Sequence, residues 1–436
     1  TPGISSAASD VYKRQGVVSA NWQQWRGPNA SGHAPKGNYP KTWNPKLNIQ
    51  WKSNLPGRGH SSPVTEGSNI WITTALETPA SEKEKLERLK KNDGLPSVTV
   101  LSKVSLHALQ IDPDSGEVLQ NIKVFEKKQP QWVHKLNSYA SPTPVLENQR
   151  LYLHFGAFGN ACIDTQSHEI IWKNNQSDLW VMHENGPGSS PIIWQDLMIF
   201  HLDGSDRQSV VALYKDTGKI AWQTKRSGEM RDNPQFQKSY STPVIAQSMG
   251  QPILISCAAD WVYGYNPANG RELWKIKYGI LGFSNVARPV LGHGMFFIST
   301  CFMKGEIHAY RYEGLEVPKL VWKMNKGAPK IPSPTLIGNE LYVINDGGIL
   351  SCMDALSGEL HWRERLDGEF SASPIYANRL LYLSDRAGKT TVIRPGKSLQ
   401  IVSENELDGS SHMATLAPLE DSFLVRTNEA FYRIQK

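Results

Sequence analysis

The sequence is poor in cysteine and contains no long apolar run. Its four cysteines, Cys162, Cys257, Cys301 and Cys352, stand far apart, so there is no C-x-x-C pair, haem-attachment motif or zinc-ligand spacing. Isolated cysteines favour buried structural thiols over disulfides. Because no stretch of 18 apolar residues exists, no membrane span is predicted.

The chain also has little excess charge. Its 47 basic and 41 acidic residues give a net charge of +6 that is spread along the sequence. A nucleic-acid-binding protein would carry a clustered basic stripe, so nucleic acid is excluded as a partner. Neither a G-x-S-x-G elbow, an H-E-x-x-H motif nor a Walker loop is present, and no hydrolase class is indicated.

What the sequence does contain is a repeat of about 40 to 50 residues. Each unit begins with a Ser/Thr-x-Pro-like segment, continues through apolar β runs and a tight Asp/Asn-x-x-x-Gly turn, and ends in a run with tryptophan. Asn266, Gly270 and Trp274 have the same spacing as Asp354, Gly358 and Trp362. A fixed period of short strands indicates a repeat array.

The starts and the ends of the units give the same number. Proline lacks an N–H donor and marks the first residue of a strand or an edge. Seven units start at Pro63, Pro144, Pro191, Pro243, Pro289, Pro334 and Pro374, with Ala414 expected at the eighth position. Six units end at Trp51, Trp172, Trp222, Trp274, Trp322 and Trp362, with Leu119 and Ile401 expected at the same place in the other two.

An offset between starts and ends predicts how the array closes. The first ending strand, around Trp51, precedes the first start at Pro63, while no tryptophan strand follows the last start. If the N-terminal strand joins the last unit, two free sheet edges disappear. The predicted fold is therefore an all-β, eight-bladed β-propeller of four-stranded antiparallel blades, closed by the N-terminal strand. The repeated tryptophans are expected to pack between blades.

The motif Ala-x-Asp-x-x-Ser/Thr-Gly-x-x-x-Trp resembles the repeat of β-propellers of the pyrroloquinoline-quinone (PQQ) type. Segments at residues 22–29, 56–59, 138–144, 240–243 and 370–374 extend the resemblance to secreted bacterial PQQ-binding-like propeller repeat proteins. This superfamily includes quinoprotein alcohol dehydrogenases and the propeller lipoprotein of the outer-membrane β-barrel assembly machinery. The resemblance covers residues 21–436 and implies a fold rather than an activity.

The domain organisation follows from the same pattern. Residues 21–436 are expected to form one propeller, with a helical insertion at 78–97 in the first blade that Ser81 and Glu84 cap. Residues 1–20 are expected to be a non-native leader or the remnant of a signal peptide, because residues 17–20 end in small side chains. An ordinary linker is the alternative. The signal-peptide interpretation predicts a periplasmic or secreted protein.

Candidate binding residues lie in the linkers between one blade and the next, which gather on one face of a propeller. These linkers are rich in Arg, Lys, His and Tyr, which suits an anionic or hydroxyl-rich ligand. Polar linkers are also ordinary at a propeller rim, so a solvated channel is the alternative. The candidates are Arg58, His60, Lys135, Tyr139, His183, Asn185, Arg231, Tyr240, Arg288 and His412. No catalytic residue and no metal ligand is predicted.

The sequence therefore favours a non-catalytic, monomeric binding or scaffold module for a protein, a peptide, or a small anionic or carbohydrate ligand. The alternative is a quinoprotein-type oxidoreductase. The resemblance implies that such enzymes hold the quinone against a tryptophan beneath adjacent cysteines, with calcium bound by Glu, Asn and Asp. This chain has no adjacent cysteine pair, so it gives PQQ no support as a cofactor.

Overall fold

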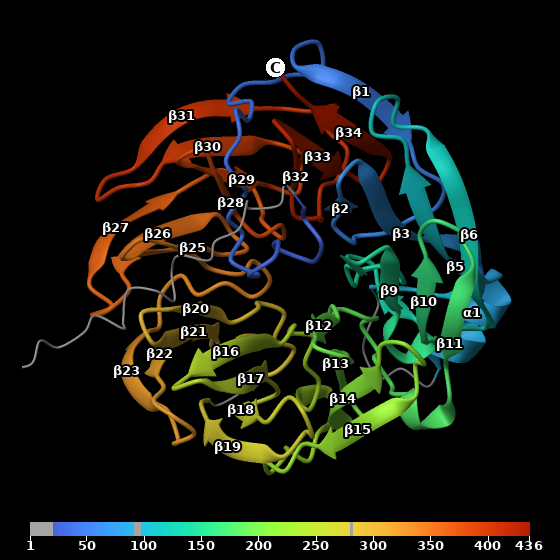
Figure 1. Cartoon of the computed structure of the whole chain (residues 1–436), viewed down its shortest axis with the longest axis horizontal. Helices are drawn as coiled ribbons and strands as arrows, with labels where there is room; N and C mark the ends of the chain where they lie inside the picture. The colour runs from blue at the N-terminus through green and yellow to red at the C-terminus, as the bar shows by residue number, and fades with distance from the viewer. Residues whose placement is uncertain (1–20, 91–96, 280–281) are drawn as a thin grey trace, which may run out of the picture.

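The computed structural model describes residues 21–90, 97–279 and 282–436, and it confirms the eight-bladed β-propeller (Figure 1). Blades 1 to 4 are β2 (Val64–Glu66), β3 (Asn69–Pro79), β5 (Leu101–Ile111) and β6 (Val118–Lys128); β8 (Val145–Glu147), β9 (Arg150–His154), β10 (Asn160–Asp164) and β11 (Ile170–Asn174); β12 (Ile192–Trp194), β13 (Leu197–Asp203), β14 (Gln208–Tyr214) and β15 (Ile220–Lys225); and β16 (Val244–Ser248), β17 (Gln251–Cys257), β18 (Trp261–Tyr265) and β19 (Glu272–Lys277).

The remaining blades continue the ring in chain order. Blades 5 to 8 are β20 (Val290–Gly292), β21 (Met295–Ser299), β22 (Ile307–Arg311) and β23 (Lys319–Met324); β24 (Thr335–Ile337), β25 (Glu340–Ile344), β26 (Ile349–Asp354) and β27 (Leu360–Arg365); β28 (Ile375–Ala377), β29 (Leu380–Ser384), β30 (Thr390–Arg394) and β31 (Gln400–Asn405); and β32 (Ala417–Leu419), β33 (Ser422–Arg426), β34 (Ala430–Ile434) and β1 (Ile49–Asn54). The pairing of β1 with β34 confirms closure by the N-terminal strand.

Seven inner strands begin directly after the predicted prolines, as β2 does after Pro63. In blade 8 the residue before the strand is Leu416, so the expectation that Ala414 marks this position is wrong by two residues. The blade instead carries a proline inside the strand, at Pro418. This is tolerated because an inner strand is a sheet edge whose N–H has no ladder partner on one side.

The tryptophans lie between blades, as predicted. The indole Nε1 of Trp172 in blade 2 donates to the carbonyl of Lys215 in blade 3 at 2.8 Å, and a Cβ on Gly218 would lie 2.3 Å from the same ring. The turn glycine thus leaves room for the indole of the preceding blade. The same glycine–indole contact occurs between Gly116 and Trp51, Gly270 and Trp222, and Gly358 and Trp322.

Two blades have no aromatic residue at this position. Each outer strand has a β-bulge just before the tryptophan position, and this bulge sets which residue points inward. In blade 1 the bulge leaves Gln120 opposite Gln110, and in blade 7 it leaves Ser403 opposite Val392. Leu119 and Ile401 are 50% and 51% exposed, so their assignment to the tryptophan position is wrong.

The apolar core lies between neighbouring blades rather than at the centre of the disc. One cluster, for example, joins Tyr152, Cys162 and Trp172 of blade 2 to Phe200 and Val211 of blade 3. All four cysteines are buried and free, which agrees with their prediction as structural thiols. Such interfaces are well packed because each sheet buries both of its faces.

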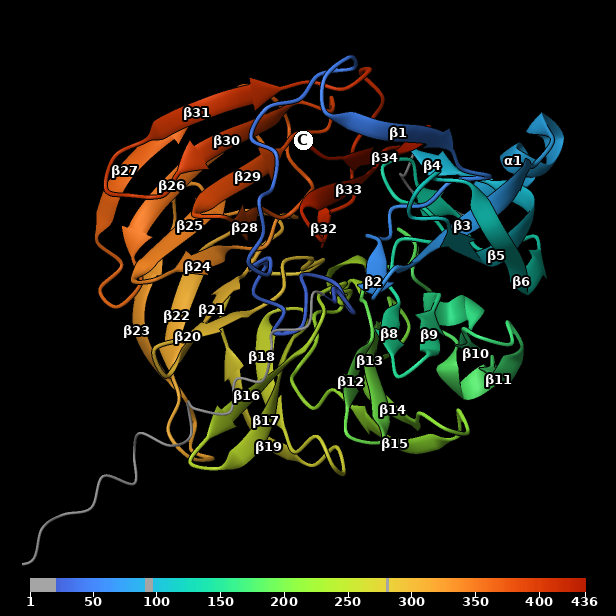
Figure 2. The ribbon, with the colours of Figure 1, turned by 45° about the horizontal axis from the view of Figure 1, so that its top comes forward.

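Blade 1 is longer than the other blades and projects from the ring (Figure 2). Between β3 and β5 lies α1 (Glu82–Leu89), in which the Glu84 amide donates to the capping Ser81 hydroxyl at 3.2 Å. A short pair, β4 (Val98–Thr99) and β7 (Val133–His134), connects this extension to the next linker. No helix in the described ranges is long and apolar enough to cross a membrane.

Adjacent inner strands are joined around the axis by a ring of hydroxyl groups. Just before the inner strand, in seven of the eight blades, a backbone N–H donates to the hydroxyl of the next blade at 2.9 to 3.2 Å. The last bond, from Thr415 N to Ser62 Oγ, joins blade 8 to blade 1. The hydroxyl ring consists of Ser62, Thr143, Ser190, Thr242, Ser333, Ser373 and Thr415, and Arg288 occupies the blade 5 position.

Candidate ligand-binding cleft

A cleft of about 660 Å³ opens at the axis of the propeller, where linkers from all eight blades converge. Its size lies within the range of small-molecule and peptide-side-chain sites. The wall includes His60 and Ser62 from blade 1; His134, Leu136, Asn137 and Thr143 from blade 2; Asn185 and Ser190 from blade 3; Gln235, Lys238 and Tyr240 from blade 4; Phe283 and Phe302 from blade 5; Lys330 and Asp346 from blade 6; Ser371 and Arg386 from blade 7; and Met413 and Thr415 from blade 8.

The N-terminal segment forms the floor of this cleft. Residues 21–47 cross the ring near its centre before β1 begins (Figure 1). Trp22 N donates to Thr65 O at 3.0 Å and Leu146 N donates to Gln23 O at 2.8 Å, so the segment is bonded to the inner strands β2 and β8. The Trp25 indole faces the cleft and donates to Thr415 Oγ1 at 3.3 Å. Trp25 of this segment therefore forms part of the cleft surface.

One side of the cleft is aromatic. The Phe283 ring lies 4.7 Å from that of Phe236 and 5.7 Å from that of Phe302. The Lys330 ammonium lies 4.9 Å from the Phe302 centroid, within cation–π distance. Phe302 and Leu136, which both line the cleft, are each 44% exposed. Large apolar side chains left open to solvent in a concave site indicate a binding surface.

Cations outnumber carboxylates among the lining residues. Lys238 donates to Glu184 at 2.9 Å behind the wall, and Arg386 donates to Ser371 Oγ at 2.7 Å. The Asp346 carboxylate accepts the Lys330 backbone N–H at 2.6 Å, and burial raises its pKa. Lys238 and Arg386 are ion-paired with Glu184 and Glu369, both at 2.9 Å. Among the described residues, Lys330 is therefore the lining lysine or arginine outside an ion pair, and it favours a ligand that offers an acceptor.

His60 is held neutral beside this wall. Burial, followed by the charges of Arg58 and Arg426, lowers the pKa of His60 to about 3. Its Nε2 is buried without a hydrogen-bond partner among the described residues. At neutral pH this imidazole is therefore an uncharged donor or acceptor.

Three of the ten sequence-predicted site residues, His60, Asn185 and Tyr240, line the cleft. The Tyr240 hydroxyl donates to His183 O at 2.8 Å, and burial raises the pKa of Tyr240. Arg58 and Lys135 lie beside the rim, where the Arg58 guanidinium donates to Lys135 O at 2.5 Å. These residues can contact a ligand only at the edge of the cleft.

The other five predicted residues lie outside the cleft wall. Arg231 is paired with Asp260 at 2.6 Å. Tyr139 belongs to the core between blades 1 and 2. His183 accepts the Ala157 amide at 2.8 Å, and His412 is 1% exposed. Arg288 is buried beneath the floor, where it donates to Trp25 O at 3.1 Å. The ten residues therefore divide into three members of the cleft wall, two neighbours of its rim, four buried supports and Arg231, which is partly exposed in its ion pair.

Several cleft residues were not predicted because they lie outside the blade-to-blade linkers. Phe302, Asp346 and Arg386 each follow the second strand of a blade, and these loops open on the same face as the linkers. Trp25 comes from the non-repeating N-terminal segment. The loops after β21, β25 and β29 recur with the blades, so their place in the repeat is the sequence signal that could identify the first three residues.

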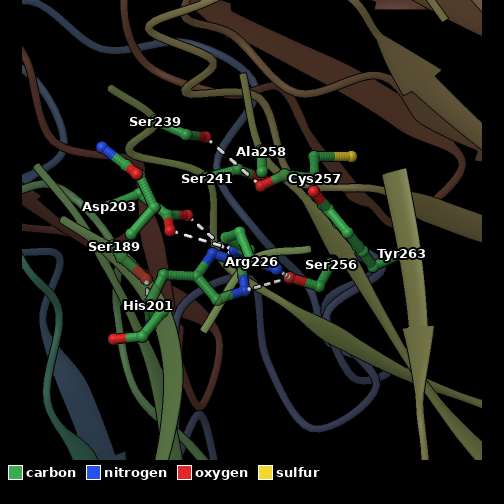
Figure 3. Close-up of polar contacts among 12 residues, drawn as sticks. Ser189, His201, Asp203, Arg226, Ser239, Ser241, Ser256, Cys257, Ala258 and Tyr263 are labelled. Atoms are coloured by element: carbon green, nitrogen blue, oxygen red, sulfur yellow. Dashed lines mark hydrogen bonds and ion pairs between the residues drawn. The ribbon is translucent and has the colours of Figure 1, made fainter. Parts of the chain in front are cut away.

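A separate polar cluster is buried between blades 3 and 4 (Figure 3). The Arg226 guanidinium donates to both Asp203 oxygens, at 3.0 and 2.7 Å, and to Ser256 Oγ at 2.6 Å. His201 Nε2 lies 2.8 Å from the same hydroxyl. Burial lowers the pKa of Arg226, but the facing Asp203 carboxylate has the larger effect, so the pKa of Arg226 is raised.

This cluster is a structural connection rather than a site. The side chains of Asp203 and Arg226 are fully buried, so no substrate reaches the histidine–serine pair. Breaking a buried ion pair by removing one partner typically costs about 3–5 kcal/mol. The cluster therefore fixes blade 3 against blade 4 behind the cleft.

The residues present do not fit a calcium-dependent quinone. Calcium takes six to eight oxygen ligands, mostly carboxylates and carbonyls. The lining offers Asp346, whose carboxylate already accepts the Lys330 amide, and the cysteines lie apart in the strands or loops of separate blades. Within residues 21–90, 97–279 and 282–436, no group of three or more His, Cys, Asp or Glu side chains is placed to hold a metal ion.

The sequence model of one protein family, described as "Outer membrane protein assembly factor BamB", matches this chain at residues 48–224, 111–300 and 258–396. Outer membrane protein assembly factor BamB of Yersinia pestis is 23% identical over 217 residues, which is 47% of this chain. The chain spans about half of that relative, since the match covers 50% of its length.

Solved structures with the same fold are more distant in sequence. BamB from Moraxella catarrhalis superposes with a TM-score of 0.53 at 10% identity, covering 78% of this chain and 94% of that structure. The computationally designed Ika8 protein superposes with a TM-score of 0.58 at 8% identity, covering 88% of this chain and 99% of that structure. At these identities the likeness shows the propeller fold alone.

Proposed function

Because the chain belongs to the family of the outer membrane protein assembly factor BamB, we propose that it is a non-catalytic binding scaffold of the bacterial periplasm. Its axial cleft docks a segment of a partner protein. In this proposal residues 1–20 derive from a leader, residues 21–436 are the working propeller, and the protein is a monomer. The family's printed description supports a role in the assembly of outer membrane proteins.

The observation that carries the proposal is the open aromatic cleft. Exposed Phe302 and Leu136 both line a cavity that Lys330 and Arg386 also line. An inserted apolar side chain would bury surface against the phenylalanines, and neighbouring backbone carbonyls or carboxylates would accept from the cations. His60, Asn185 and Tyr240 complete the wall, and Arg58 and Lys135 would contact the partner at the rim.

Site-specific photocrosslinking tests this assignment. A photoreactive phenylalanine at position 302 or 136, in protein expressed in a bacterial periplasm, is expected to form a discrete adduct with a partner. Matched positions on the outer strands, Leu320 and Ile401, are equally exposed at 47% and 51% and should give none. Adding Phe283→Ala should reduce the yield from position 302, because it removes the ring that supports Phe302.

Equal adducts from the outer strands would contradict docking at the cleft. Two other results would favour a different function. Stabilisation by a sugar acid in a thermal screen would favour a small anionic or carbohydrate ligand. Dye reduction after addition of PQQ and calcium would favour the quinoprotein alternative.

A further inference from the structure

Two arginines are buried beneath the cleft floor without a carboxylate partner. Arg26 is 1% exposed and Arg288 is 3% exposed. Neither forms an ion pair among the described residues, and no acidic side chain contributes to the pKa of either. Two other buried arginines are ion-paired, Arg226 with Asp203 and Arg433 with Glu420. A third, Arg426, also lacks a carboxylate partner among the described residues, but it donates to the Ser61 hydroxyl and to Thr73 O. Burying a charge without a partner costs free energy, so two buried arginines without a carboxylate need an explanation.

Arg26 has donors that nothing in the described protein accepts. One terminal nitrogen donates to Ser31 O at 3.1 Å and to Thr335 Oγ1 at 3.0 Å. The Nε and the other terminal nitrogen are buried and have no partner. A buried, charged donor without a protein acceptor typically marks a place where a water or an ion binds.

Arg288 brings a second positive charge to the same turn. Its Nε donates to Pro243 O and one terminal nitrogen donates to Trp25 O, both at 3.1 Å. It takes the one position in the hydroxyl ring where the other seven blades have Ser or Thr. Both of its acceptors are neutral carbonyls, so they satisfy the donors without balancing the charge.

The two guanidiniums remain charged at neutral pH. Burial lowers the pKa of Arg26 to about 9. Burial, followed by the nearby charge of Arg26, lowers the pKa of Arg288 to about 9. Since both values lie above 7, two like charges are held together in a buried place.

We propose that Arg26 and Arg288 form a binding site for a small monovalent anion, either a halide or a carboxylate group. The anion accepts from the free Arg26 donors and neutralises the pair, and so secures the Trp25–Arg26 turn as the floor of the cleft. It comes either from solution or as the carboxylate of a ligand that enters from the cleft. This site does not depend on the proposed scaffold function.

Thermal unfolding of the full chain at constant ionic strength tests the site. Replacing gluconate, which is too bulky, by chloride or formate at pH 7.5 is expected to raise Tm saturably, by about 3 °C at a hundredfold excess over Kd. Arg26→Gln and Arg288→Ser should each abolish or strongly reduce this response, and Arg288→Ser also completes the hydroxyl ring. Arg433→Gln, which removes a buried arginine that already has a carboxylate partner, should keep the response.

The source of the anion is distinguished by a second arm. If butyrate and phenylacetate act where chloride does not, and Phe302→Ala removes their effect, the carboxylate enters from the cleft. If chloride acts alone, the anion is a free ion. Bromide soaked into wild-type crystals should give an anomalous peak beside the Arg26 guanidinium, which tests the site even if a variant fails to fold. A Tm that is independent of anion identity, together with no bromide peak, overturns the proposal.

Discussion

At the scale of single residues, the turn glycines are fixed by both backbone and packing. Gly358 has a φ of +76°, and a Cβ there would lie 2.6 Å from the Trp322 ring of the preceding blade. Either condition alone disfavours a side chain. The repeated glycine of the sequence motif therefore marks a contact between blades as well as a turn.

Gly358→Ala is expected to destabilise the propeller by about 2–4 kcal/mol, because backbone strain adds to overpacking against Trp322. The matched control is Gly250→Ala. Gly250 has a φ of +75°, but nothing lies within 4 Å of its Cβ position, so only about 1 kcal/mol of strain is expected. Urea denaturation of both variants measures the difference. Equal losses would show that the indole contact contributes nothing.

The residues of the site were harder to predict than those of the repeat. Charge and position in a linker selected Tyr139, His183 and His412, but these side chains are buried. A linker residue points into the cleft or into the protein depending on one or two local dihedrals, which no period in the sequence encodes. Asn185 and Tyr240 line the cleft and were predicted on the same grounds.

At the scale of elements, neighbouring inner strands cannot pair as a sheet across the axis, so hydroxyl groups join them. The Thr143 N–H donates to Ser190 Oγ at 3.0 Å and the Ser190 N–H donates to Thr242 Oγ1 at 2.9 Å. Each hydroxyl satisfies a buried backbone donor of the preceding blade. The Ser or Thr directly before the starting proline is therefore as much a part of the repeat as the proline itself.

Ser190→Ala should leave the Thr143 N–H buried without an acceptor and should cost about 1–3 kcal/mol. Ser190→Thr keeps the hydroxyl and is the rescue variant, since Thr occupies the same ring position at Thr143, Thr242 and Thr415. Guanidinium denaturation followed by tryptophan fluorescence provides the comparison. If Ser190→Ala and Ser190→Thr unfold at the same midpoint, the ring bond does not contribute to stability.

The strands could be predicted because the prolines that start each unit and the tryptophans that end it recur at a fixed spacing. The two blades that lack this tryptophan could not be predicted correctly. Gln120 and Ser403 replace tryptophan in the two blades where an aliphatic residue one or two positions away was predicted instead. The bulge that sets the register has no strong sequence signal. The loops that contribute Phe302, Asp346 and Arg386 vary in length, so the repeat did not single out their side chains.

At the scale of the whole molecule, closure of the ring by the N-terminal strand could be predicted, but the path of residues 21–47 beneath the cleft could not. Closure followed from a simple offset, because a Trp strand came before the first Pro start. Residues 21–47 have no repeat, and their path across the ring depends on single hydrogen bonds such as that from Arg288 to Trp25 O. The floor, and with it the proposed anion site, became visible only in three dimensions.

Closure makes a specific prediction about local stability. In an open repeat array the terminal units have one neighbour and fray first, whereas a closed ring has no terminal unit. Amides of β34 in blade 8 should therefore exchange with deuterium as slowly as those of β18 in blade 4. Trp51 links β1 to the ring through Phe431, at a centroid distance of 5.4 Å, and through Pro113 O, at 2.8 Å.

Trp51→Ala removes both contacts and should destabilise the protein by about 3–5 kcal/mol. Exchange in β34 is expected to accelerate about tenfold or more, because it becomes the effective edge of the ring, while β18 changes less. Trp222→Ala, an equivalent loss inside the ring, is the control and should leave β34 protected. If β34 already exchanges much faster than β18 in the wild type, the N-terminal strand covers the seam without locking it, and the stability of the propeller resides in the other seven blades.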